Sequence, residues 1–77
     1  MNGHMYKVIE LIGVSNESWE KAAATAVEEA SKHLQDLRIG EVTKLDMQIS
    51  EGKVVSYRAR VNVSFKYHPE VHEAGAG

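Results

Sequence analysis

The feature that most constrains this chain is an unbroken alternation of apolar and polar side chains from Val55 to Tyr67. The odd positions are apolar and the even positions polar: Val55, Tyr57, Ala59, Val61, Val63, Phe65 and Tyr67 against Ser56, Arg58, Arg60, Asn62, Ser64 and Lys66. A period of two is typical of a β-strand with one buried and one solvated face. The packing of the apolar face therefore decides the fold, and the partner of the cationic face decides the function.

The length of the chain limits how it can be stabilised. At 77 residues it forms one domain, in which the gain from apolar burial nearly balances the loss of conformational entropy. There is no cysteine, which excludes disulfides and thiolate metal sites, and the four histidines do not have the spacing of a structural zinc site. Self-association is therefore the expected source of additional stability.

Charge and hydropathy argue against two classes of partner. The net charge is −2 with both signs interspersed, which does not favour nucleic acid. No apolar run approaches the roughly 20 residues of a membrane span, and no signal segment opens the chain. We expect a cytoplasmic protein that binds neither nucleic acid nor a membrane.

The two ends of the chain differ in composition from its middle. We expect residues 1–4 to be a cloning remnant or a flexible N-terminus, residues 5–67 to form the domain, and residues 68–77 to be a flexible C-terminal tail. In this tail Pro69 cannot continue a central strand, and the Gly/Ala ending has nothing to bury.

Four elements are predicted within the domain. Residues 5–12 form a strand buried on much of both faces and central in the sheet, and Gly13 ends it. Residues 17–36 form a helix with Ser15 or Asn16 as N-cap, whose apolar positions recur at spacings of three and four: Trp19, Ala22, Ala23, Ala26, Val27, Ala30, Leu34 and Leu37. After Gly40, residues 41–50 form a second strand, and the turn at Glu51-Gly52 joins it to the long last strand as a hairpin.

The order β-α-β-β predicts an α+β fold with one helix for three strands. One helix covers only one face of such a sheet, so the other face must meet water, a ligand or another subunit. That face carries Lys44, Asp46, Gln48, Arg58, Arg60 and Asn62. A solvated face with cross-strand salt bridges and a binding face both remain open at this point.

The sequence contains no recognisable catalytic constellation, and we predict no catalytic residue. The six glycines are dispersed rather than gathered into a phosphate-binding loop, and the predicted domain, residues 5–67, has neither a nucleophile elbow nor a histidine pair at helical metal spacing. The pair His33 and Glu29 is interpreted as an exposed helix pair, Trp19 as a core or interface residue, and Met47 as a core residue.

Three stretches together resemble one protein family. They are YKVIELIGVSNESWEKAAATAVEEA, then LRIGEV, then the strand ending in VNVSFKY, and the combination is similar to the dodecin family over residues 6–67. The resemblance implies a subunit whose three-stranded antiparallel sheet curls around its helix. It also implies assembly into a hollow homododecamer that binds and stores flavin without catalysis.

The family's flavin-binding residues are only partly present in this chain. Flavin-binding dodecins stack a tryptophan on the ligand three residues before the valine of the second strand, and alignment through Glu41-Val42 places Ile39 there. The family's ring-binding glutamine falls at Arg58 and its phosphate-binding basic residue at Asp46, whereas Lys66 keeps a cation. Without the tryptophan, flavin binding loses the stabilisation that one stacked aromatic pair provides, about 0.5–1.5 kcal/mol. The resemblance therefore implies that binding of flavin (FMN or riboflavin) is weakened or lost.

Two functions remain open from the sequence. The first is small-molecule storage, with flavin or another nucleotide-like cofactor such as coenzyme A as the ligand. Its anionic part would be anchored by Arg58, Arg60 and Lys66. The family-equivalent positions of the ligand site are Ile39, Lys44, Asp46, Gln48, Arg58 and Lys66. The second is calcium binding or metal-stabilised assembly, in which Glu41, Asp46 and acids of neighbouring subunits converge on a symmetry axis. The second matches a branch of dodecins that lacks the stacking tryptophan and includes calcium-binding members.

Overall fold

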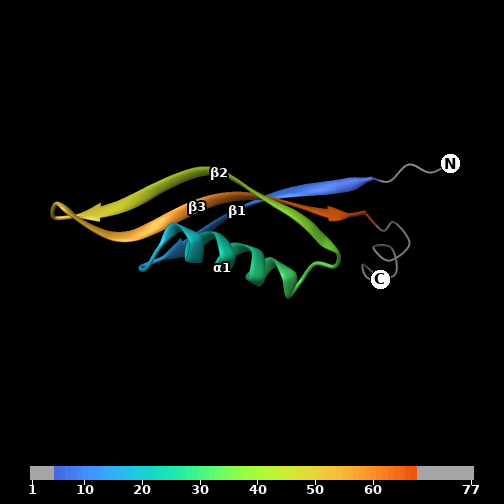
Figure 1. Cartoon of the computed structure of the whole chain (residues 1–77), viewed down its shortest axis with the longest axis horizontal. Coiled ribbons are helices and arrows are strands. Elements are labelled where there is room, and N and C mark those ends of the chain that lie inside the picture. The colour runs from blue at the N-terminus through green and yellow to red at the C-terminus, as the bar shows by residue number, and fades with distance from the viewer. Residues whose placement is uncertain (1–4, 68–77) are drawn as a thin grey trace.

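The computed structural model describes residues 5–67 as one helix and three strands. In chain order these are β1 (Tyr6–Ser15), α1 (Trp19–Ser31), β2 (Leu37–Ser50) and β3 (Lys53–Lys66). The strands form one antiparallel sheet in the order β1-β3-β2, and α1 lies across one face of it (Figure 1). The predicted β-α-β-β fold is confirmed, whereas the predictions for residues 1–4 and 68–77 lie outside the described residues.

The strand with the long alternation, β3, is the centre of the sheet. It pairs with β1 along one edge and with β2 along the other. Its odd positions under α1 are buried: Ala59, Val61, Val63 and Phe65. Ala22 and Ala26 of α1 complete the core, with partly buried side chains around them: Ile9, Leu11, Ala23, Val27 and Leu37. Because these alanines are small, α1 can approach the sheet closely. The face of the sheet that α1 covers is called the inner face below.

The first strand differs from its prediction in position and burial. β1 is an edge strand, because the chain leaving α1 returns on the far side of β3 instead of beside β1. It continues through Gly13, where an added Cβ would lie 1.9 Å from the carbonyl oxygen of Ala22, so the glycine permits close contact with α1. Its apolar residues on the outer face, the face away from α1, are half exposed: Tyr6, Val8, Ile12 and Val14. The predicted burial on both faces does not occur within one chain.

The helix is shorter than predicted at its C-terminal end and starts with a different cap. Ser18 is the N-cap, and its hydroxyl accepts a hydrogen bond from the Lys21 amide at 3.0 Å. The helix ends at Ser31 rather than at residue 36, and the amides of His33 and Leu34 both bond to the Ala30 carbonyl. Leu34 and Leu37 therefore lie beyond the helix, and Leu37 reaches the core from β2.

The second strand begins four residues earlier than predicted and is irregular. Asp36 has a φ of 59° before the strand begins at Leu37, so Gly40 lies inside the strand instead of before it. The pairing with β3 shifts between Leu37 and Ile39, between Val42 and Lys44, and between Gln48 and Ile49. Each shift changes which side chains face outward.

The hairpin between β2 and β3 extends beyond the rest of the sheet. The predicted turn is confirmed, with Glu51 at φ 52° and Gly52 at φ 78°. The last pair that β1 makes with β3 joins Ser15 to Tyr57, so the hairpin tip projects past β1 and α1 (Figure 1). Apolar side chains near this tip are exposed: Met47, Ile49, Val54 and Val55.

Candidate functional site

The polar side chains predicted for the open face of the sheet lie together on the outer face. The register pairs Gln48 with Ser56, Asp46 with Arg58, Lys44 with Arg60, Glu41 with Asn62 and Ile39 with Ser64. Residues directly opposite each other on antiparallel strands share a face, with Cβ atoms about 4.5–5.5 Å apart. The outer face therefore carries a row of five cross-strand pairs between β2 and β3. The half-exposed residues of β1 lie on the same face, along the opposite edge of β3.

Asp46 and Arg58 form the strongest ionic contact of this row. The Arg58 Nε donates to Oδ1 of Asp46 at 2.7 Å, and its Nη2 donates to Oδ2 at 3.0 Å. The hydrogen bond from Arg58 lowers the pKa of Asp46 below its ordinary value, with further lowering by the charges of Lys44 and Arg60. Asp46 in turn raises the pKa of Arg58. Both carboxylate oxygens are thus occupied by one guanidinium, and the two predicted ligand-binding residues neutralise each other.

Trp19 fixes the backbone of Asp46 from the other side of the sheet. Its indole Nε1 donates to the Asp46 carbonyl at 3.0 Å, and its ring meets that of Tyr57 edge to face at 5.2 Å between centroids. The tryptophan thereby ties the start of α1 to the middle of β2. Sequence reasoning did not find this contact, because nothing in the local pattern connects residues 27 positions apart.

The next pair toward the hairpin tip is neutral. Ser56 is buried, and its hydroxyl donates to Oε1 of Gln48 at 3.0 Å. The side-chain oxygen of Gln48 is therefore engaged within the subunit, although its amide nitrogen can still donate to a ligand.

Ile39 lies at the other end of the row, where flavin-binding dodecins are expected to stack a tryptophan. It is 65% exposed and lines a shallow pocket of about 480 Å³ with Tyr6, Arg38 and Ser64. Ile39 gives this pocket an apolar contact, and Tyr6 of β1 supplies its ring. The sequence did not indicate Tyr6 or Arg38, because the shift after Leu37 decides which β2 residues face outward.

Lys66 is far from the other predicted anchors. It pairs with Tyr6 at the end of β3, eight residues from Arg58 on the same strand. At about 3.3 Å per residue this separates the two by about 26 Å. One small anion cannot contact both within a single subunit.

The predicted metal ligands do not converge within one subunit. Glu41 is opposite Asn62 and Asp46 opposite Arg58, so the two acids lie about 13 Å apart along the sheet. Among residues 5–67 there is no group of three His, Cys, Asp or Glu side chains that could hold a metal ion. Since Arg58 also occupies both oxygens of Asp46, these residues do not form a calcium site by themselves.

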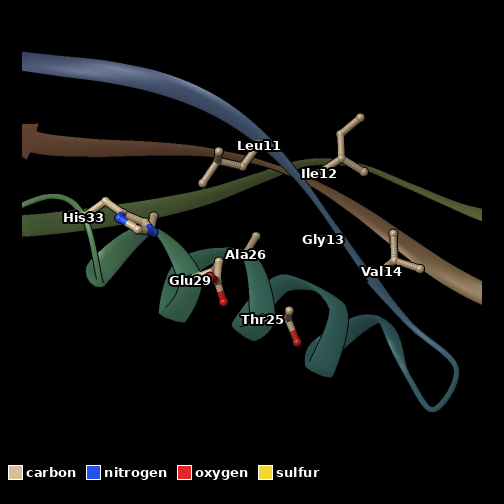
Figure 2. Close-up of a pocket in the computed structure, with 9 residues that line it drawn as sticks. Leu11, Ile12, Gly13, Val14, Thr25, Ala26, Glu29 and His33 are labelled. Atoms are coloured by element: carbon tan, nitrogen blue, oxygen red, sulfur yellow. The ribbon is translucent and has the colours of Figure 1, made fainter.

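A second hollow lies on the inner side of the sheet, between β1 and α1. Figure 2 shows β1 passing over α1 at Gly13, with Thr25, Ala26 and Glu29 on the helix, His33 beyond its end, and the side chains of Ile12 and Val14 pointing away from it. The lining is largely apolar, and its volume is about 440 Å³. His33 lies in the turn after α1, whereas the sequence analysis had placed it within the helix.

None of the described helices has the length and apolar character needed to cross a lipid bilayer. This agrees with the absence of an apolar run of about 20 residues from the sequence.

Comparison with known proteins gives consistent matches. Residues 5–68 match the family model for dodecin. The calcium dodecin of Mycobacterium tuberculosis is 43% identical over 65 residues, which cover 84% of this chain and 92% of that protein. Its crystal structure gives a TM-score of 0.76 at 45% identity and covers 84% and 93% of the two chains. The dodecin structure from Streptomyces coelicolor gives 0.83 at 32% identity and covers 88% and 97%.

Proposed function

Because the chain belongs to the dodecin family, we propose that it is a cytoplasmic, non-enzymatic binding and storage protein that works as a homododecamer. We further propose that its flavin binding is weakened or lost. Dodecins are binding and storage proteins, and we infer that the outer face of this chain decides what it binds. The proposal therefore rests on the differences between this outer face and that of flavin-binding members.

Exposed apolar side chains support assembly. Large apolar residues on both faces of the sheet are 44–65% exposed in the single chain: Met5, Tyr6, Val8, Ile12, Val14, Ile39, Val42, Leu45, Met47, Ile49, Val54 and Val55. Burying apolar area stabilises by about 25 cal/mol per Å², and a domain this small gains little from its own core. Contacts between copies would bury β1, whose composition had predicted a central strand.

The observation that carries the proposed change of ligand is the ion pair between Asp46 and Arg58. In the family comparison these positions hold a phosphate-binding cation and a ring-binding glutamine. Here they satisfy each other through two hydrogen bonds, and the stacking position holds the aliphatic Ile39. Any flavin must compete with an existing charge-assisted pair and does so without its main stacking partner.

The test combines native mass, colour and titration. Light scattering at micromolar concentration should give about twelve times the 8.5 kDa of one chain, and the purified protein should be colourless. Titration into FMN, followed by flavin fluorescence, should show little quenching at tens of micromolar. A monomer or dimer mass contradicts the assembly, and strong quenching contradicts the loss of flavin binding.

A second candidate function is calcium binding, which the 43% identity to the M. tuberculosis calcium dodecin favours. In this chain Glu41 is exposed on the outer face, whereas Asp46 is held by Arg58. A site with several oxygen ligands, as calcium requires, therefore needs carboxylates from neighbouring subunits. Calorimetry with calcium should give heat that Glu41→Gln abolishes and Glu20→Gln, on the exposed surface of α1, does not. Absence of heat, together with unchanged melting in a chelator, counts against this candidate.

A further inference from the structure

Two cations lie directly opposite each other on the outer face, and among residues 5–67 the one ion pair that compensates either of them is the long contact from Arg60 to Glu10. Lys44 of β2 is directly opposite Arg60 of β3. Like charges in this position repel each other and destabilise a sheet. The Asp46 carboxylate attracts both cations through space, but its two oxygens already accept hydrogen bonds from Arg58. Neither cation therefore has a carboxylate at hydrogen-bonding distance among residues 5–67.

The backbone has a specific irregularity that creates this arrangement. The pairing shifts between Val42 and Lys44, leaving Thr43 as the extra residue of a bulge. The hydroxyl of Thr43 donates to the Arg60 carbonyl at 3.3 Å. Without the extra residue, strict alternation from Val42 would place Lys44 on the inner face. The bulge thus places Lys44 on the same face of the sheet as Arg60.

The guanidinium of Arg60 is incompletely satisfied. Its Nε is buried and has no hydrogen-bond partner. The nearest carboxylate, that of Glu10 on β1, lies 4.0 Å from Nε, beyond hydrogen-bonding distance. Leaving a buried donor unpaired is unfavourable, and more so for a charged group. An anion that accepts from Nε would remove this cost.

The local charge balance favours an added anion. Lys44, Arg58 and Arg60 carry three positive charges against the carboxylates of Asp46 and Glu10, which leaves an excess of one. Arginine presents a planar fork that fits phosphate or carboxylate, and lysine adds a point charge. One phosphate group has enough acceptor oxygens to take hydrogen bonds from both Arg60 and Lys44.

We propose that Lys44 and Arg60 form a phosphate-binding site on the outer face, in which Arg60 donates through Nε and Lys44 through Nζ to one phosphate group. This inference deepens the proposed storage function and rests on it for the phosphate-bearing ligand class. It differs from the expected flavin contacts, since Arg58 is excluded by its pairing with Asp46 and Lys66 lies about 20 Å from Arg60 along β3.

The test titrates inorganic phosphate into the full-length protein and follows the Arg60 Nε–H signal by NMR and the melting temperature. Phosphate should shift the signal saturably and raise the melting temperature. Lys44→Met and Arg60→Met should each weaken binding at least tenfold, whereas Lys53→Met, at the start of β3 near the hairpin tip, should not. In phosphate-free buffer, Lys44→Met should melt higher than the wild type, because it removes the repulsion.

Two further arms identify the source of the phosphate and separate this site from the assembly. FMN and riboflavin differ by a phosphate, so a response to FMN that riboflavin lacks indicates a phosphate monoester as ligand, and a response to inorganic phosphate alone indicates the free ion. The native mass is measured in the same samples. A monomer that binds phosphate contradicts the dodecamer and retains the site. If the protein is a dodecamer but phosphate causes no saturable shift, the proposed phosphate site is refuted. It is also refuted if Lys44→Met binds phosphate as tightly as the wild type.

Discussion

The guanidinium of Arg58 and the carboxylate of Asp46 hold each other across β2 and β3 through hydrogen bonds of 2.7 and 3.0 Å. The indole of Trp19 holds the same aspartate by its backbone carbonyl. Asp46 is thus fixed at both its side chain and its main chain. Both residues of this pair were expected from the sequence to be ligand-binding positions, so the proposed function depends on how firmly they hold each other.

The first prediction concerns acid stability. The pKa of Asp46 is lower in the folded protein than its ordinary value of 3.8. Its stabilising contribution is therefore complete above the ordinary pKa and is lost as the pH falls through the lower folded pKa. Arg58→Gln should raise the pKa of Asp46 and lower the free energy of unfolding at pH 7. At a pH below the folded pKa the variant and the wild type should differ much less.

Carboxyl ¹³C NMR can measure this pKa directly. The chain contains two aspartates, Asp36 and Asp46, so labelled aspartate gives two signals to assign. Lys21→Gln is the matched control, since the ion pair of Lys21 with Glu17 on the helix surface is exposed and contributes little. An Asp46 pKa that stays the same in Arg58→Gln contradicts the role of the pair.

The second prediction concerns the indole hydrogen bond. Trp19→Phe keeps an aromatic ring near Tyr57 but removes the donor to the Asp46 carbonyl. The free energy of unfolding should fall by about 0.5–1.5 kcal/mol, the usual net worth of one hydrogen bond. Circular dichroism must follow the denaturation because Trp19 is the sole tryptophan. Glu20→Gln, which lies next to it and is exposed, should change stability by much less; equal losses contradict the assignment.

The third prediction compares two glycines of the sheet. A Cβ on Gly13 meets the Ala22 carbonyl oxygen at 1.9 Å, whereas a Cβ on Gly40 meets the side chain of Val27 at 3.3 Å. Gly13→Ala should cost about 3 kcal/mol or more, because backbone must move. Gly40→Ala should stay within about 1 kcal/mol of the wild type, since a small side-chain shift relieves the contact and alanine is favoured over glycine in a strand. Chemical denaturation that ranks the two variants in the opposite order contradicts the packing of α1 on β1.

The fourth prediction restores an aromatic ring to the outer face. Ile39 is exposed beside Tyr6, so Ile39→Trp can be accommodated without repacking the core. Each stacked ring adds about 0.5–1.5 kcal/mol, which corresponds to about 2- to 12-fold tighter flavin binding. Fluorescence titration with riboflavin measures the gain, and Ile39→Leu is the control of similar size. If the tryptophan variant binds no better than the leucine variant, Ile39 is not the stacking position.

Local patterns were sufficient to predict the elements and much of the core. The alternation between Val55 and Tyr67 identified β3 and the buried set Ala59, Val61, Val63 and Phe65. The helical spacing of the alanines identified the face of α1 that packs on the sheet, and Glu51-Gly52 identified the hairpin turn. These features depend on backbone geometry and on side chains a few residues apart, which the sequence itself determines.

The order of the strands and the identity of the contacts on the outer face depended on the tertiary structure. The apolar composition of β1 predicted a central strand, but the route of the chain after α1 places β3 between β1 and β2. Likewise, the bulge at Thr43 decides that Lys44 faces Arg60, and pairing across the sheet decides that Arg58 binds Asp46. Register and strand order come from contacts between segments distant in the chain, which no local periodicity encodes. The sequence thus determined which residues are polar and outward, and the fold decided which of them are held in hydrogen-bonded ion pairs and which are not.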